Sequence, residues 1–303
     1  MPSRTAAGGR AAVVTGAGVG PATRRGAPHA PAWLAALPAL VVIGLFSAYP
    51  VLVMVANSLG LGQPPADGGP TLEHYARALG SVTVREALLN SLYIAVGSVL
   101  ITLCVAVPVV LRQADDDRAG RRGGAATDAL LTLPIALPGI IIGFFAIVLT
   151  GRTGLLGLAW DGFSGLAYTF SGLLIAYLYF SLPRVLGPLR GAAATLDPSL
   201  TESARTLGAS RPRVFLTVTL PLLLPAAIET SGTAIAVALG GYGTVATLSE
   251  GVRLLPLNVA NELTTGYRLA ASSTLAVILA ATAVLALVLG RVLARAVRRA
   301  VAS

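Results

Sequence analysis

The stretch TESARTLGASRPRVFLTVTLPLLLPA, residues 201–226, changes character along its length. Its first half carries charged and hydroxylated side chains with signals that start and stop helices, whereas its second half is an apolar run with two prolines. An apolar run of about 20 residues is long enough to cross a hydrocarbon core of about 30 Å. The stretch therefore predicts a water-facing segment that leads directly into a membrane span.

Runs of this length recur along the chain, which is 55% hydrophobic and only 12% charged, with a mean hydropathy of +0.78. The predicted spans are Ala32–Val55, Ala87–Leu111, Ala129–Thr150, Gly162–Pro183, a fifth that starts near Leu220, and Leu269–Gly290. Because the runs are continuous and do not alternate with polar residues, they favour helices over a transmembrane barrel. The expected fold is an all-α integral membrane protein, a six-helix polytopic bundle.

The basic residues predict the orientation of this bundle, because cytoplasmic loops collect Lys and Arg close to the ends of spans. All 22 basic residues are arginine, and 17 of them fall on one side of the expected topology. Five of the 17 follow the fourth span: Arg184, Arg190, Arg205, Arg211 and Arg213. Both termini are therefore predicted to be cytoplasmic. The net charge of +9 is explained by topology, so no nucleic-acid partner is expected.

Several kinds of chemistry are excluded by composition. A phosphate-binding P-loop needs a lysine, and the sequence contains none, so any ATP hydrolysis must come from another subunit. No G-x-S-x-G or H-E-x-x-H motif occurs. The single Cys104 and the separated His29 and His74 suggest no metal site. The chain is predicted to be neither an enzyme nor a cofactor-binding protein.

Three parts are expected along the chain: a disordered cytoplasmic tail over 1–31, a six-span transmembrane domain over 32–295, and a basic cytoplasmic tail over 296–303. The longest cytoplasmic loop, 184–219, carries two successive sets of helix signals. Asp197 can cap a helix that begins at Pro198 and stops at Gly208. Glu202 is expected in the first turn of this helix, where its charge favours the helix dipole. Ser210 can cap a second helix that continues into the fifth span.

The same loop resembles the signature of permease subunits of binding-protein-dependent ATP-binding cassette importers, E-A-A, three residues, G, nine residues, I-x-L-P. The matching positions are Glu202, Ser203, Ala204, Gly208, Val218, Leu220 and Pro221. Ser203 replaces the second-position alanine and Val218 replaces isoleucine, while the spacing is unbroken. The six expected spans, with this loop between the fourth and fifth, also resemble the type I importer core over residues 32–295.

This resemblance implies a set of partners and a location. A second permease subunit, the same chain or a related one, would complete the membrane channel. A cytoplasmic ATP-binding subunit, which holds ATP and Mg, would receive the signature loop as a coupling helix. An extracytoplasmic binding protein would deliver the substrate. The chain would be a multi-pass protein of a bacterial or archaeal plasma membrane.

The fifth span contains the one carboxylate predicted within the membrane, Glu229, with Thr230 and Thr233 beside it. An intramembrane carboxylate is costly unless it is paired or hydrated. These three residues therefore form either a wetted part of the translocation path, which could attract cations, or a structural hydrogen bond. A third alternative is that the span starts later in the sequence, which would place Glu229 nearer the headgroups.

Other residues of the spans suggest packing and substrate class. Gly232, Ala236 and Gly240 form a small-residue stripe that favours close helix packing, and Pro134 and Pro138 predict a kink in the third span. The sequences LGAS and ALGGYGTVATLSEG resemble permeases for polyamines, thiamine, iron, phosphonates, sulfate or molybdate more than sugar permeases. A secondary transporter coupled to a proton or cation gradient through Glu229 is the alternative function.

Overall fold

The computed structural model describes residues 32–61, 70–120 and 125–302, and every regular element in these ranges is a helix. Six helical segments are long and apolar enough to cross a membrane, as the sequence predicts. In chain order the elements are α1 (Ala32–Ile43), η1 (Gly44–Ala48), α2 (Tyr49–Ser58), α3 (Glu73–Gly80), α4 (Val82–Arg118), α5 (Ala125–Thr132), η2 (Leu133–Ile135), α6 (Gly139–Thr150), α7 (Leu155–Ala159), α8 (Phe170–Ala194), α9 (Pro198–Thr206), α10 (Arg211–Val214), η3 (Phe215–Thr219), α11 (Leu220–Leu239), α12 (Tyr242–Leu248), α13 (Leu255–Thr264) and α14 (Leu269–Ala302). The segment 1–31, expected to be a disordered tail, lies outside the described residues.

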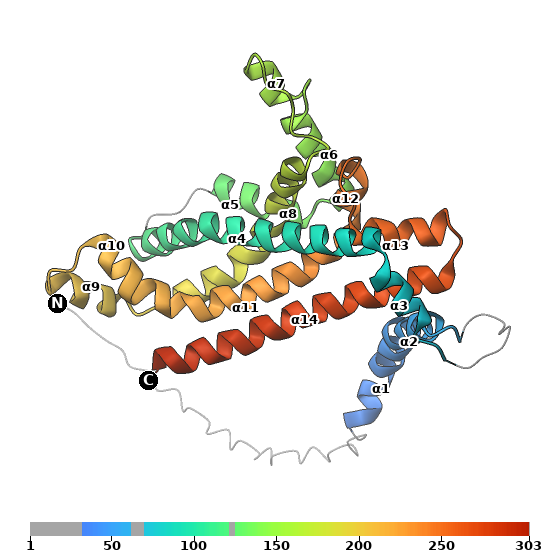
Figure 1. The fold of residues 1–303 in the computed structure, drawn as a ribbon. Coiled ribbons are helices and arrows are strands. Elements are labelled where there is room, and N and C mark those ends of the chain that lie inside the picture. The colour runs from blue at the N-terminus through green and yellow to red at the C-terminus, as the bar shows by residue number, and fades with distance from the viewer. Residues whose placement is uncertain (1–31, 62–69, 121–124, 303) are drawn as a thin grey trace, which may run out of the picture. The chain divides into compact units, whose positions relative to one another are not determined.

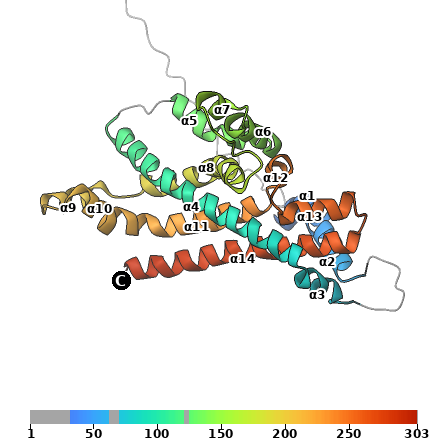
Figure 2. The same cartoon turned by 45° about the horizontal axis from the view of Figure 1, so that its top comes forward.

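The chain divides into two units, residues 1–49 and 50–303. In the first unit, α1 continues without a break into the π-helical turn η1. The second unit is a helical bundle in which α4, α8, α11 and α14 run side by side (Figures 1 and 2). Its core is apolar and includes Val99 of α4, Leu186 of α8 and Leu223 of α11. Because lipid tails are as apolar as these side chains, the core stabilises the bundle through van der Waals packing between the helices.

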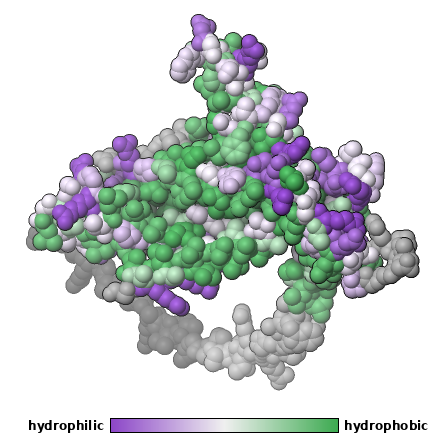
Figure 3. Space-filling view, viewed as in Figure 1, coloured by the Kyte–Doolittle hydropathy of each residue, from purple (hydrophilic) through white to green (hydrophobic). Residues whose placement is uncertain are grey.

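The two ends of this bundle differ from its flank in the polarity of their side chains. The chain segment α9–α10 and the C-terminal end of α14 lie at one end, and α3 and α13 lie at the other (Figures 1 and 2). Hydrophobic side chains cover the flank of α4, α11 and α14, while polar side chains gather toward the ends (Figure 3). This pattern is typical of a bundle whose flank faces lipid and whose ends face water.

Arginines of the α3–α13 end are paired with carboxylates of that end. Arg77 lies 2.9 Å from Glu73, Arg253 lies 3.1 Å from Glu86, and Arg268 lies 2.7 Å from Glu262. These pairs offset the positive charge of this end. The excess of arginine that the sequence places on one side is consequently concentrated at the α9–α10 end.

Two predicted spans differ from their expected bounds because of proline. The third is interrupted between α5 and α6, where Pro134 and Pro138 leave a short 3₁₀ turn, so the predicted kink is a complete break. The fourth does not stop at Pro183: α8 continues to Ala194 with Pro183 and Pro188 inside it. A proline within a membrane helix is tolerated when neighbouring helices and side chains compensate the lost backbone bond. The loop expected from residue 184 therefore begins at Thr195.

The fifth and sixth helices also extend beyond their expected bounds. A continuous helical segment runs from Arg211 through η3 to Leu239. The sixth, α14, continues to Ala302, so the basic residues expected in a tail over 296–303 lie on its last turns. The helices thus project past the apolar runs that the sequence identifies.

The small-residue stripe packs α11 against α14 at one of its predicted positions. A Cβ atom added to Gly232 would lie 2.9 Å from Cα of Gly290, and a Cβ on Gly290 would lie 2.8 Å from Cα of Gly232. Real Cβ contacts are not this short, so the two backbones require glycine on both sides. Gly240 ends α11 and makes no such approach.

Candidate functional site

The signature residues divide between two structural elements at the arginine-rich end. Glu202, Ser203 and Ala204 lie on α9, with Gly208 just beyond its end. Val218 lies in the π-helical turn η3, and Leu220 and Pro221 begin α11. The first group belongs to the corner between α8 and α10, residues 195–210, which we call the corner loop. The second group belongs to the long helix that follows it.

Helix α9 starts as predicted. Asp197 is its N-cap and accepts a hydrogen bond at 2.9 Å from the amide of Ser199, while Pro198 occupies the first helical position. This bond lowers the pKa of the Asp197 carboxyl from its ordinary value of 3.8, because it favours the charged form. Glu202 is exposed and is the fifth residue of α9, so its predicted place in the first turn is wrong. A helix beginning at Pro198 has completed its first turn before residue 202.

The end of α9 explains the glycine of the signature. Gly208 has a φ of +85°, a left-handed conformation that glycine adopts without strain. Its amide donates to the carbonyl of Arg205 at 2.9 Å, and the amide of Ala209 donates to the carbonyl of Ala204 at 3.1 Å. These two bonds form a Schellman motif, which satisfies carbonyls that the helix leaves free. The carbonyl of Ala204 and the left-handed backbone of Gly208 therefore both belong to the motif that ends α9.

The second helix of the corner starts differently from the prediction. Ser210 occupies the N-cap position of α10, but its side chain makes no capping hydrogen bond. Beyond α10, the amide of Leu220 donates to the carbonyl of Phe215 and closes the π-helical turn. Pro221 has no amide hydrogen for the carbonyl of Thr217, so this wider turn lies next to a missing helix bond.

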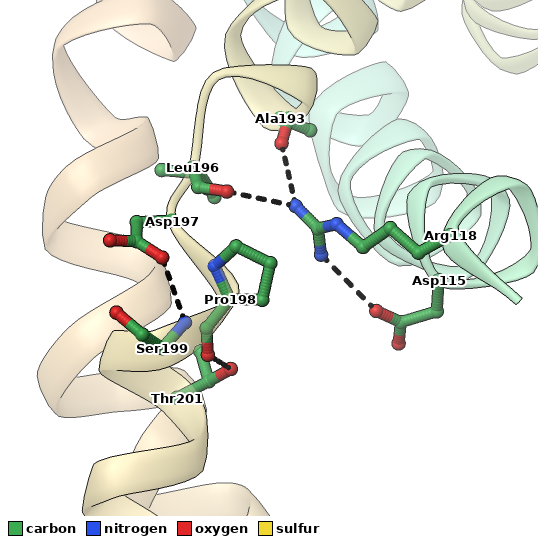
Figure 4. Close-up of polar contacts among 8 residues, drawn as sticks. All are labelled: Asp115, Arg118, Ala193, Leu196, Asp197, Pro198, Ser199 and Thr201. Atoms are coloured by element: carbon green, nitrogen blue, oxygen red, sulfur yellow. Dashed lines mark hydrogen bonds and ion pairs between the residues drawn. The ribbon is translucent and has the colours of Figure 1, made fainter.

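Arg118, the last residue of α4, holds the corner loop to the bundle (Figure 4). One of its terminal nitrogens donates to the carbonyl of Leu196 at 3.0 Å and to the carbonyl of Ala193 at 3.3 Å. The other lies 3.5 Å from a carboxylate oxygen of Asp115. Because Leu196 directly precedes the Asp197 cap, Arg118 fixes the point at which α8 gives way to α9.

A second arginine ties the same end of α8 to two other helices. Arg190 donates to Oε1 of Gln113 on α4 at 2.8 Å and to Oδ1 of Asp128 on α5 at 2.6 Å. Gln113 also donates to Asp128 at 3.0 Å, so the three side chains form a closed set. Sequence reasoning assigned Arg118 and Arg190 to topology alone. Their partners on other elements are 62 to 78 residues away, and no local spacing marks such contacts.

The corner loop presents apolar side chains on its outer side. Leu207 is 88% exposed and Leu200 is 48% exposed. These two leucines give the corner loop apolar contact area among its polar side chains. A short helix with fixed ends and exposed leucines can serve as a docking element.

The predicted path residues lie together in a second feature at this end. Glu229, Thr230 and Thr233 line a cavity of about 340 Å³ with Arg184, Pro188 and Ala226. Oε2 of Glu229 lies 3.3 Å from Arg298 on α14. Glu229 is about 27 Å along the helical segment that starts at Arg211, and Arg298 belongs to the basic end of α14. The ion pair with Arg298 therefore links Glu229 to the basic end of α14.

These features define a helical membrane protein with a rigid corner between its fourth and fifth spans. Comparison with known proteins agrees, because the family model described as "Binding-protein-dependent transport system inner membrane component" matches residues 118–299. The chain belongs to this family of importer permeases. The matched region begins at Arg118 and includes the corner loop, the cavity and Arg298.

Similar proteins include several permeases of one substrate group. The chain is 34% identical over 179 residues to the molybdenum transport system permease protein ModB of Escherichia coli K12, covering 57% of this chain and 78% of the relative. It is 35% identical over 208 residues to ModB of Mycobacterium tuberculosis, covering 66% and 77%. It is 31% identical over 212 residues to the molybdate/tungstate transport system permease protein WtpB of Thermococcus kodakarensis, covering 69% and 78%.

Solved structures share the fold at low identity. A chain of a bacterial alginate ABC transporter, in complex with an alginate pentasaccharide-bound periplasmic protein, superposes with a TM-score of 0.71 at 15% identity, covering 88% of this chain and 94% of that one. A chain of the MetNI methionine ABC transporter in inward-facing conformations gives a TM-score of 0.57 at 19% identity, covering 71% and 96%. These likenesses support the type I importer fold.

Proposed function

We propose that this permease subunit imports a tetrahedral oxyanion, molybdate or tungstate, driven by ATP hydrolysis in a separate cytoplasmic subunit. Relatives named as molybdenum and molybdate/tungstate permeases support this substrate class within the wider set that the sequence suggested. The absence of lysine from the sequence agrees with an ATPase on another chain. An extracytoplasmic binding protein and a second permease subunit, the same chain or a related one, complete the complex.

The observation that carries this proposal is the architecture of α9. Asp197 fixes its start, the Schellman motif at Gly208 fixes its end, and Arg118 fastens it to α4. A helix held at both ends moves as a rigid body, so a displacement applied to it reaches the attached spans. In this proposal the exposed Leu200 and Leu207 contact the ATPase, and Glu202 and Ser203 lie on the docked helix. The arginine-rich end, including the C-terminus, faces the cytoplasm.

The second half of the signature has a different part in this proposal. Val218, Leu220 and Pro221 lie where the π-helical turn meets α11. Pi-helical turns and prolines are local irregularities at which a helix can bend. They give the segment that follows the docked helix a defined bending point. Glu229, Thr230 and Thr233 line the cytoplasmic part of the path.

Transport by the reconstituted complex tests the function. The permease, its ATPase and its binding protein are placed in proteoliposomes, and uptake of ⁹⁹Mo-molybdate is measured with ATP supplied on the ATPase side. The proposal predicts ATP-dependent accumulation that tungstate competes. Uptake that needs no ATP, follows a proton gradient and is abolished by Glu229→Gln would instead identify the secondary transporter.

A further inference from the structure

Arg184 is the charged residue of the cavity that the preceding account leaves without a role. It lies within α8, ten residues before the helix ends, and faces the cavity formed with α11. Its guanidinium stacks on the ring of Phe180, 3.8 Å from the centroid, and one terminal nitrogen donates to the carbonyl of Phe180. The stack fixes the plane of the guanidinium group against its own helix.

Arg184 differs in its partners from three other arginines of this end. Arg118, Arg190 and Arg298 each lie within 3.5 Å of a carboxylate oxygen. Across the ranges that the structure describes, no carboxylate lies in ion-pair contact with Arg184. A guanidinium carries five N–H donors, and one of those of Arg184 is used by the Phe180 carbonyl. An arginine within a membrane span that lacks an acidic partner is a candidate for a functional role.

The remaining lining completes an environment for an anion. Glu229 contributes the negative charge of the cavity lining, and this charge is offset by Arg298 at 3.3 Å. The set of Arg184, Glu229 and Arg298 therefore carries one net positive charge. Pro188 and Ala226 offer no polar side-chain atoms, whereas Thr230 brings a hydroxyl group. The hydroxyl of Thr233 donates to the carbonyl of Glu229 at 3.3 Å. Arginine binds tetrahedral oxyanions by paired N–H donors, and hydroxyls can donate to the remaining oxygens.

We infer that this cavity is an oxyanion-binding site at the cytoplasmic end of the path, with Arg184 as its anion contact and Thr230 as hydroxyl partner. The pair Glu229–Arg298 keeps the carboxylate from repelling the anion and from binding Arg184. This inference rests on the proposed oxyanion function. It reverses the expectation that Glu229 attracts cations.

The first test compares single substitutions in the reconstituted complex. Arg184→Gln should lower ATP-driven ⁹⁹Mo-molybdate transport by about tenfold or more, the scale of one lost charge-assisted contact. Arg184→Lys keeps the charge but loses the paired N–H donors of the guanidinium. Its transport rate should lie between those of Arg184→Gln and the unaltered protein. Arg77→Gln, which removes an arginine from the opposite end, is the matched control and should transport normally. Equal transport by Arg184→Gln would overturn the inference while leaving the importer function intact.

A second test needs no substitution, so it applies even where Arg184→Gln fails to assemble. The unaltered complex is treated with phenylglyoxal, and modification of Arg184 and Arg77 is measured by peptide mass spectrometry with and without tungstate. The inference predicts that tungstate protects Arg184 and leaves Arg77 unchanged. Protection by phosphatidylglycerol vesicles with none by tungstate would assign the site to a lipid headgroup and overturn the inference. A complex that transports neither molybdate nor tungstate would remove the proposed substrate class, and this inference with it.

Discussion

A terminal nitrogen of Arg118 lies 3.0 Å from the carbonyl oxygen of Leu196, so the last residue of the second span helix holds the residue that precedes the α9 cap. The two residues are 78 positions apart in the sequence. This contact makes the corner loop part of the bundle. Force applied to α9 consequently reaches α4 as well as α8 and α11.

Arg118→Gln should release the corner loop without unfolding the bundle. The substitution leaves the carbonyls of Ala193 and Leu196 without their charged donor, a loss of about 1–3 kcal/mol of local stability. Hydrogen exchange of the amides over 195–203 should therefore quicken, while exchange in the core of α4 stays unchanged. Asp115→Asn is the control, because the exposed Asp115–Arg118 pair at 3.5 Å should contribute less than about 1 kcal/mol. Unchanged exchange of the 195–203 amides in Arg118→Gln would show that Arg118 does not hold the corner loop.

The cost of replacing Gly208 should depend on how well the new residue adopts a left-handed backbone conformation, and not on the size of its side chain. A Cβ at this position meets no atom within 4 Å, so only the φ of +85° opposes a side chain. Gly208→Ala should lower the stability of the corner by about 1 kcal/mol, and Gly208→Asn should cost less because asparagine tolerates this conformation. Protection of the Ala209 amide against hydrogen exchange measures the difference. Equal protection in both variants would show that the Schellman motif is not what requires glycine.

Acid should loosen the start of α9. The pKa of Asp197 is lower in the folded protein than its ordinary value of 3.8, so its stabilising effect is fully present above 3.8. The effect is lost as the pH falls from 3.8 through the lower, folded pKa. Exchange of the Ser199 amide, compared between variants at the same pH, should show this loss in the unaltered protein. Asp197→Asn still caps the helix and should not show it, whereas Asp197→Ala should exchange quickly at every pH.

Gly290→Leu should separate α14 from α11. A Cβ on Gly290 would lie 2.8 Å from Cα of Gly232, and a larger side chain cannot be accommodated without moving a helix. The expected result is a thermal transition lowered by several degrees in detergent, and impaired assembly. Gly187→Ala is the control, since a Cβ there meets no atom within 4 Å and alanine favours the helix. A transition that is the same in both variants would mean that the two backbones are not in contact.

The sequence predicts the spans and the corner well, because both depend on local features. Length and hydrophobicity identify six membrane segments, and Asp197, Pro198 and Gly208 mark the two ends of α9 within a few residues of chain. Helix ends that depend on tertiary packing are predicted less well. Pro183 suggests a stop that packing overrides, so Arg184 and Arg190 lie in α8 and not in a loop.

The tertiary contacts of the arginines could not be predicted at all. The Glu229–Arg298 pair joins residues 69 apart, and Arg118 reaches carbonyl groups, which any residue supplies. The prediction of membrane orientation uses these side chains only for their charge. Their individual partners depend on how the helices pack, which the apolar runs do not specify.

The central claim is that α9 is the docking helix for a separate ATPase, and extraction of the complex from its native membrane tests it most directly. The tagged chain is purified gently as the unaltered protein, as Gly208→Arg, and as Gly162→Arg. Gly162 is the matched control, since it is an exposed glycine with a φ of +90° and no atom within 4 Å of its added Cβ. We predict that mass spectrometry finds an ATP-binding subunit with the unaltered protein and with Gly162→Arg, and loses it with Gly208→Arg. Equal recovery of that subunit with Gly208→Arg, or recovery of this chain alone from the unaltered membrane, would contradict the account.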